Sequence, residues 1–253
     1  MYRVSRAKGA GNFHIQHSTF YIQHRAISFN AYHTMKQDWL IQTPGNKRLI
    51  LFMLGWGATP NAVYQLPFPA GYDVLCCYDH RQLTPLRAED FAGYERIYLF
   101  AWSFGVWVAG QSCQALPLHR AVAINGTPYP ASPQYGLRLK VLLRTIKSVA
   151  AMGGNPFKDD TSAERYAPAG PFAEPTPAQQ VEELEFLAEA CQSLPEQPHL
   201  PWHRAWIATK DEIFPPARMR AWWGELGVDF ESYHFPFYKA SIVLDELQES
   251  PAE

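Results

Sequence analysis

The sequence predicts an α/β domain in which a mostly parallel sheet is flanked by helices. From about residue 35 onward, compact apolar runs of strand length alternate with stretches in which apolar residues recur at helical spacing. The runs are apolar on both faces, as in parallel strands that helices cover on both sides. The chain has 253 residues, of which 47% are hydrophobic. It therefore suits one domain with a full core and room for an insertion.

The expected elements follow in chain order. Strand-like sequence begins at Met35 with MKQDWLIQT, and the apolar runs expected to form strands are 48–54, 73–78, 96–102, 120–126, 204–209 and 228–234. Helices or helical turns are expected at 59–66, near 88–94 and at 104–116, 137–151, 177–194, 215–227 and 237–250. The 215–227 segment starts with proline and ends with glycine, which is the usual order of helix start and stop signals.

Two segments depart from this alternation. Residues 1–34 show no clear period and contain no Asp or Glu, so we expect a disordered leader or an over-long start, with a transit peptide as the alternative. Residues 127–198 are rich in proline and polar residues and hold helical stretches without a good strand. We expect them to form a helical lid inserted between the core segments 35–126 and 199–253. The alternative is a pair of extra packing helices with no such role.

Composition and charge exclude several classes of function. A formal net charge of -2 gives no global attraction for nucleic acid. No apolar run approaches the roughly 20 residues that a membrane helix needs. The cysteines lack metal-binding spacing, and two of them are adjacent within an apolar run; they are Cys76, Cys77, Cys113 and Cys191. We therefore expect buried, reduced thiols in a cytoplasmic protein, without a metal site.

The stretch YLFAWSFGVWVAG, residues 98–110, presents a candidate nucleophile. An apolar strand breaks at Ser103, and small and apolar residues at helical spacing follow. A serine on such a tight strand–turn–helix connection needs small neighbours two positions away on either side, and Ala101 and Gly105 meet this need. Alanine replaces the usual first glycine of this motif, which is a mild departure. The alternative is that Ser103 only caps the helix.

A serine nucleophile needs a base, usually a histidine that a carboxylate orients. In strand–turn–helix hydrolases the acid and then the histidine follow the serine in the chain. Among the histidines, His234 comes after Ser103 and lies at the exit of the last expected strand. Asp211 follows the preceding strand, so both side chains can meet at one edge of the sheet. Glu212 is the competing acid, and a solvated Asp211 without a catalytic role is the other alternative.

Backbone N–H groups that stabilise an oxyanion are expected at two positions. One is Phe104, the residue after the nucleophile, and the other lies in the loop after an early strand. That loop reads Gly55-Trp56-Gly57, where glycines let the backbone approach a ligand closely. Trp56 is therefore the second candidate donor. A plain glycine turn with Trp56 in the core is the alternative.

The segments LFMLGWG, YD at 78–79, AWSFGVW, AINGTP and KDEIFP…H, in this order, resemble the BioG family. These proteins are free-standing pimeloyl-[acyl-carrier protein] methyl ester esterases of bacterial biotin synthesis. The resemblance spans Met35 to the C-terminal helical segment. It implies an α/β-hydrolase fold with a small helical lid, and it matches Ser103, Asp211 and His234. It also implies hydrolysis of a methyl ester on a pimeloyl chain, with no metal or organic cofactor.

An acyl carrier protein is strongly acidic, so its enzyme needs a basic surface. The segment YGLRLKVLLRTIKSVA offers one, because Lys140, Arg144 and Lys147 fall on one helical face with Arg138 nearby. A solvated basic face is the alternative. Three other functions stay open at this point. They are a general carboxylesterase or acyl thioesterase with the same triad, a carbon–carbon bond hydrolase, and a non-enzymatic binding module.

Overall fold

The computed structural model describes residues 34–153, 170–194 and 200–248. Contacts divide the chain into residues 1–30 and 31–253, and every described residue belongs to the second unit. The prediction for residues 1–34 therefore falls almost wholly outside the described residues. No helix in the described ranges is long and apolar enough to cross a membrane.

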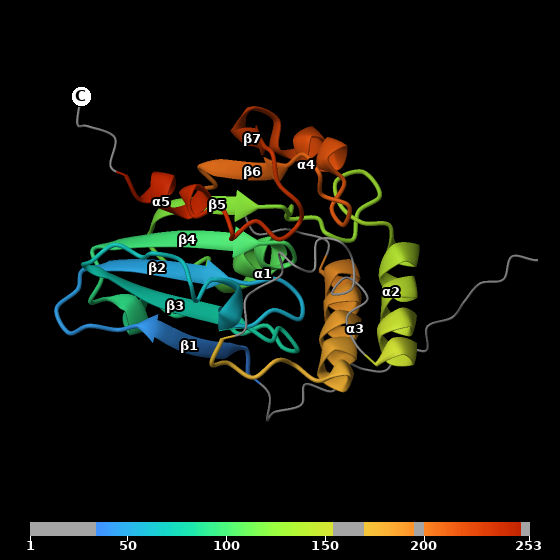
Figure 1. Ribbon diagram of the computed structural model, residues 1–253, viewed down its shortest axis with the longest axis horizontal. Coiled ribbons are helices and arrows are strands. Elements are labelled where there is room, and N and C mark those ends of the chain that lie inside the picture. Colours follow the sequence, from blue (N-terminus) through green and yellow to red (C-terminus); the bar gives the residue numbers. More distant parts are fainter. Residues whose placement is uncertain (1–33, 154–169, 195–199, 249–253) are drawn as a thin grey trace, which may run out of the picture. The chain divides into compact units, whose positions relative to one another are not determined.

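A seven-stranded sheet forms the centre of the fold, in the order β1-β3-β2-β4-β5-β6-β7 (Figure 1). Its strands are β1 Lys36–Ile41, β2 Arg48–Met53, β3 Tyr72–Tyr78, β4 Arg96–Trp102, β5 Leu118–Ile124, β6 Arg204–Ala208 and β7 Gly227–Phe230. The edge strand β1 runs antiparallel to β3, and all other neighbours pair in parallel. The mostly parallel α/β sheet expected from the sequence is confirmed.

The apolar runs bury both faces of the sheet, as their composition predicted. Alternate residues of β2 enter separate core clusters: Leu49, Leu51 and Met53 lie in one, and Ile50 and Phe52 lie in the other. The first cluster includes residues of helices α1 Gly105–Ser112 and α4 Pro216–Trp223. The second includes residues of the short C-terminal helix α5 Ser241–Leu244 and of the following 3-10 turn.

Several expected elements are shorter than predicted, and the helices expected at 104–116 and 215–227 span Gly105–Ser112 and Pro216–Trp223. The helix expected at 59–66 is a single 3-10 turn, Pro60–Ala62, and prolines that follow at 67 and 69 disfavour a longer helix. The strand expected at 228–234 ends at Phe230. The C-terminal helix is reduced to α5 and the 3-10 turn Asp245–Leu247. The short turn expected near 88–94 is present at Ala88–Phe91.

Two helices lie in the described part of the segment expected to form a lid. They are α2 Leu139–Met152 and α3 Pro177–Ser193, and they run side by side beyond the ends of the central strands (Figure 1). A capping box starts α3: the Thr176 hydroxyl accepts from Gln179 N–H, and the Gln179 amide oxygen accepts from Thr176 N–H. The division into core and lid stays a prediction, because residues 154–169 and 195–199 lie outside the described residues.

Candidate active site

Ser103 lies on a strained turn between β4 and α1. Its φ is +59°, a left-handed conformation that residues other than glycine seldom adopt. Its N–H donates to Ile124 O at 2.9 Å, which holds the turn against the end of β5. A Cβ at Gly105 would lie 2.1 Å from Met53 O, and one at Gly126 would lie 2.3 Å from Ser103 O. The turn therefore requires these glycines, and Ser103 is not the N-cap of α1, which is Phe104.

The structure brings the predicted serine, histidine and aspartate together in one hydrogen-bonded chain. Ser103 Oγ lies 2.9 Å from His234 Nε2, and His234 Nδ1 lies 2.8 Å from Asp211 Oδ2. All three side chains are less than 10% exposed. In this arrangement Nδ1–H donates to the carboxylate, so Nε2 is free to accept the proton of the serine hydroxyl.

Asp211 is itself held in place by the loop that follows β6. Its second oxygen, Oδ1, accepts from Ile213 N–H and Phe214 N–H, both at 2.8 Å. One oxygen thus binds the backbone while the other faces His234. The competing acid Glu212 is exposed and lines the pocket next to His234, but His234 Nδ1–H donates to Asp211.

His234 does not stand at the end of a strand, as the sequence predicted, but four residues beyond β7. Its backbone carbonyl accepts from Trp102 Nε1 and from Asn125 Nδ2, each at 2.9 Å. Asn125 Oδ1 in turn accepts from Ala208 N–H at 2.8 Å. The Phe214 ring stacks on the imidazole with centroids 5.8 Å apart. A short edge strand alone would not fix this loop, so these contacts set the position of the imidazole.

Sequence reasoning missed the roles of Trp102 and Asn125. Both residues lie in motifs that the sequence analysis used: Trp102 directly precedes Ser103, and Asn125 belongs to the AINGTP segment. The signal for Asn125 was its place directly after a strand and before a glycine, where a non-glycine residue can adopt a left-handed turn. Its φ is +48°.

A mostly apolar pocket opens at Ser103 and His234. It is lined by Trp56, Trp102, Ser103, Phe104, Leu137, Val141, Leu142, Thr145, Leu184, Glu212, Ile213 and His234. Core residues form one wall, and residues of α2 and α3 form the other. An apolar pocket with few polar groups at one point is typical of a small-molecule or acyl-chain site.

Both predicted oxyanion donors border this pocket. Phe104 directly follows Ser103, and Trp56 lies in the loop after β2. Within the described part of the chain, neither backbone N–H group donates a hydrogen bond. Trp56 is half-buried rather than part of the core, and its indole N–H donates to Gln180 O of α3 at 2.7 Å.

The predicted basic residues lie at the start and on the exposed surface of α2. Arg138 is the N-cap of the helix, and Arg138, Lys140, Arg144 and Lys147 are all exposed. Other residues of the same helix, Val141, Leu142 and Thr145, line the pocket. One helix therefore carries both an apolar pocket wall and exposed positive charge.

Burial raises the pKa values of all four cysteine thiols, and none forms a disulfide. Cys76, Cys77 and Cys113 are buried, and Cys191 is half-buried. Residues 34–153, 170–194 and 200–248 contain no cluster of three or more His, Cys, Asp or Glu that could hold a metal ion.

Comparisons with known proteins agree with this geometry. A sequence model of the family described as Pimeloyl-ACP methyl esterase BioG matches residues 35–240. The crystal structure of BioG from Haemophilus influenzae is 30% identical with a TM-score of 0.70, and the match covers 85% of this chain and 100% of that chain. The α/β hydrolase MGS-M2, from a deep-sea metagenome library, has a TM-score of 0.55 at 12% identity over 87% and 96% of the two chains.

A longer curated relative also matches this chain. Malonyl-[acyl-carrier protein] O-methyltransferase from Bacteroides fragilis is 31% identical over 210 residues. The match covers 81% of this chain but 42% of that protein, so this chain spans less than half of its length. The family match covers most of the chain, and the sheet topology agrees with it. The chain therefore has the α/β-hydrolase fold and belongs to the BioG family.

Proposed function

We propose that this protein is a serine esterase that hydrolyses the methyl ester of pimeloyl-[acyl-carrier protein] in biotin synthesis. The products are methanol and pimeloyl-[acyl-carrier protein]. The observation that carries the proposal is the continuous hydrogen-bonded chain from Ser103 through His234 to Asp211 at an apolar pocket. Membership of the BioG family supports the substrate.

The chemistry follows from the position of each group. His234 Nε2 takes the proton of Ser103 as Oγ attacks the ester carbonyl, and Asp211 stabilises the imidazolium that forms. The Trp56 and Phe104 N–H groups donate to the oxyanion. Collapse of the tetrahedral intermediate expels methanol, which takes the proton from His234. Water, activated by the same imidazole, then releases the free carboxylate and restores Ser103.

The pocket supports an extended apolar acyl chain as the substrate. Its walls are mostly aliphatic and aromatic, and its polar groups are few, with Ser103 and His234 adjacent among them. A methyl ester at the far end of such a chain would reach Ser103, while the end attached to the carrier stays outside. Burial of the chain supplies binding energy that scales with its apolar area.

Electrostatics support an acidic protein as the carrier of that chain. The net charge of the protein is near zero, so a local basic surface would provide the attraction. Arg144 and Lys147 stand exposed on α2, the helix that also walls the pocket. We propose that the carrier docks there, with Arg138 and Lys140 as further contacts. Similarity to a protein named for malonyl-[acyl-carrier protein] supports a carrier-bound substrate.

The test is an incubation of the full chain and its Ser103→Ala variant with pimeloyl-[acyl-carrier protein] methyl ester, resolved by intact mass. The expected result is loss of one CH₂ group from an intact carrier conjugate, with no loss in the variant. Cleavage at the thioester would reassign the protein as an acyl thioesterase. Hydrolysis of small esters alone would indicate a general carboxylesterase, and hydrolysis by the Ser103→Ala variant would remove Ser103 from the mechanism.

A further inference from the structure

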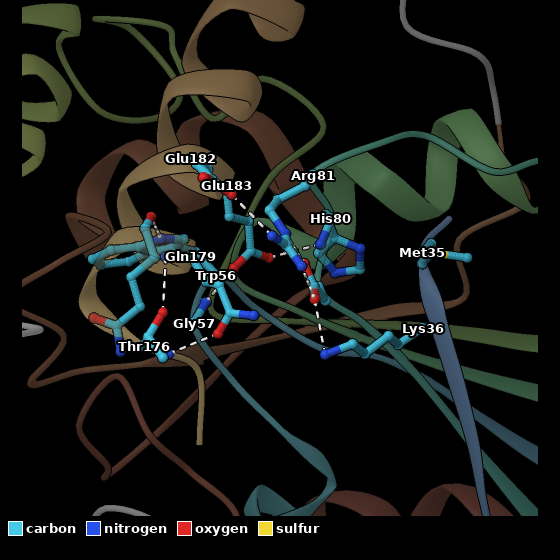
Figure 2. Close-up of polar contacts among 12 residues, drawn as sticks. Met35, Lys36, Trp56, Gly57, His80, Arg81, Thr176, Gln179, Glu182 and Glu183 are labelled. Carbon is cyan, nitrogen blue, oxygen red and sulfur yellow. Dashed lines mark hydrogen bonds and ion pairs between the residues drawn. The ribbon is translucent and has the colours of Figure 1, made fainter. Parts of the chain in front are cut away.

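One buried carboxylate joins helix α3 to two loops of the core. Glu183, which is 3% exposed, accepts from Gly57 N–H at 3.0 Å through Oε2 and from His80 N–H at 2.8 Å through Oε1. Gly57 lies in the loop after β2, and His80 lies just after β3. Figure 2 shows the Glu183 side chain directed between the two loops. Each oxygen thus holds a different loop.

Helix α3 also holds the side chain of Trp56. The Trp56 indole N–H donates to the carbonyl of Gln180, one turn before Glu183 on α3. The backbone on one side of Trp56 is therefore tied through Gly57, and its side chain is tied through the indole. With both restrained, the Trp56 N–H has little freedom to change direction. Leu184, the next residue on α3, lines the pocket.

We propose that Glu183 is a positioning residue of the oxyanion site, an inference that rests on the esterase function proposed above. By binding the Gly57 and His80 N–H groups, its carboxylate holds the loop that directs the Trp56 N–H toward the developing oxyanion. Glu183 does not touch the substrate. It acts through the loop, and it couples the placement of α3 to the assembly of the site.

Burying a carboxylate costs free energy, so a link between a helix and a loop that served stability alone would not be expected to use one. Burial raises the pKa of Glu183 to about 7 despite the two hydrogen bonds that favour its charged form. The charged groups that act on it are Asp79 and Arg81. The two N–H donors face different oxygens of Glu183, and an amide would place an NH₂ group against one of them, so it could not hold both loops. A carboxylate fits this geometry because it presents one acceptor oxygen to each loop.

Glu183→Gln tests the proposal, with Glu182→Gln as the matched control. Glu182 is the adjacent residue on α3, and its carboxylate accepts from Arg81 at 2.9 Å at the surface. The full chain and both variants are assayed for kcat and KM on p-nitrophenyl butyrate and for thermal unfolding. The rate at which a fluorophosphonate labels Ser103 is measured in parallel.

We expect Glu183→Gln to lower kcat per folded molecule roughly 10- to 100-fold with KM nearly unchanged, because a misdirected donor is lost in the transition state alone. Thermal unfolding at the assay pH gives the folded fraction by which kcat is corrected. Glu182→Gln should stay within about twofold of the wild type, since a surface ion pair contributes little. A wild-type kcat in Glu183→Gln, or a loss explained by a smaller folded fraction, would overturn the proposal.

The labelling rate separates this inference from the proposed function. If the wild-type protein hydrolyses no ester, the proposed function fails, but phosphonylation of Ser103 still depends on the oxyanion donors. At least about tenfold slower labelling of Glu183→Gln would then support the positioning role. Equal labelling of the two proteins would refute it.

Discussion

Replacing Asp211 with asparagine should abolish most activity while leaving the fold intact. In the native site Oδ1 accepts from the Ile213 and Phe214 N–H groups, and Oδ2 accepts from His234 Nδ1–H. The asparagine amide has one oxygen for these two places. Two backbone donors hold that oxygen at the Oδ1 position, so the NH₂ group must face His234.

An NH₂ group beside Nδ1 reverses the imidazole tautomer. Nδ1 then accepts, the proton moves to Nε2, and Nε2 no longer accepts the Ser103 proton across the 2.9 Å contact. In serine proteases the equivalent change lowers kcat about 10⁴-fold, and we expect a similar loss here. The free energy of unfolding should change by less than about 1 kcal/mol, because the shape and the two backbone bonds are kept.

The assay is kcat on a p-nitrophenyl ester from pH 6 to 9, with a urea unfolding curve for each variant. Glu212→Gln is the matched control, because Glu212 neighbours Asp211 and lines the pocket without contacting His234 Nδ1. It should keep wild-type kcat within about threefold. An Asp211→Asn variant with more than about a tenth of wild-type kcat would refute the tautomer argument.

Three further predictions follow from single features of the structure. Gly105→Ala should destabilise the protein by about 3 kcal/mol or more, because the new Cβ would lie 2.1 Å from Met53 O; Gly93→Ala, with open space around it, should be nearly neutral in the same urea unfolding curves. Arg144→Glu with Lys147→Glu should raise KM for the carrier-protein substrate about tenfold and spare a small ester, an effect that shrinks with added salt; equal losses on both substrates would count against docking at α2. Because burial raises the folded-state pKa of Glu183 from 4.5 to about 7, the folded protein binds a proton more tightly than the unfolded chain. The free energy of unfolding should therefore fall by roughly 3 kcal/mol as pH rises from 4.5 to about 7, and Glu183→Gln should lack this dependence on pH. His80 stays neutral in this range, since burial lowers its pKa to about 4.

Local sequence signals predicted most of the framework. The apolar runs at 48–54, 73–78 and 96–102 became strands within one residue at each end, because a parallel strand covered on both faces needs a continuous apolar run. Chain-end and edge elements were predicted less well. The strand β7, which begins at Gly227, and the C-terminal helix are short, because few contacts reinforce an element at an edge and local propensity alone does not set its length.

By itself the sequence determined which residues could form the site. Ser103 stood out because a strand–turn–helix connection is local, and Asp211 and His234 followed from the order of elements along the chain. Only the tertiary structure decided what holds these groups. The bonds from Trp102 and Asn125 to His234 O join residues more than 100 positions apart, as do those from Gly57 and His80 to Glu183. Periodicity records which face of an element is apolar, but it does not record which distant polar groups meet once that face is buried.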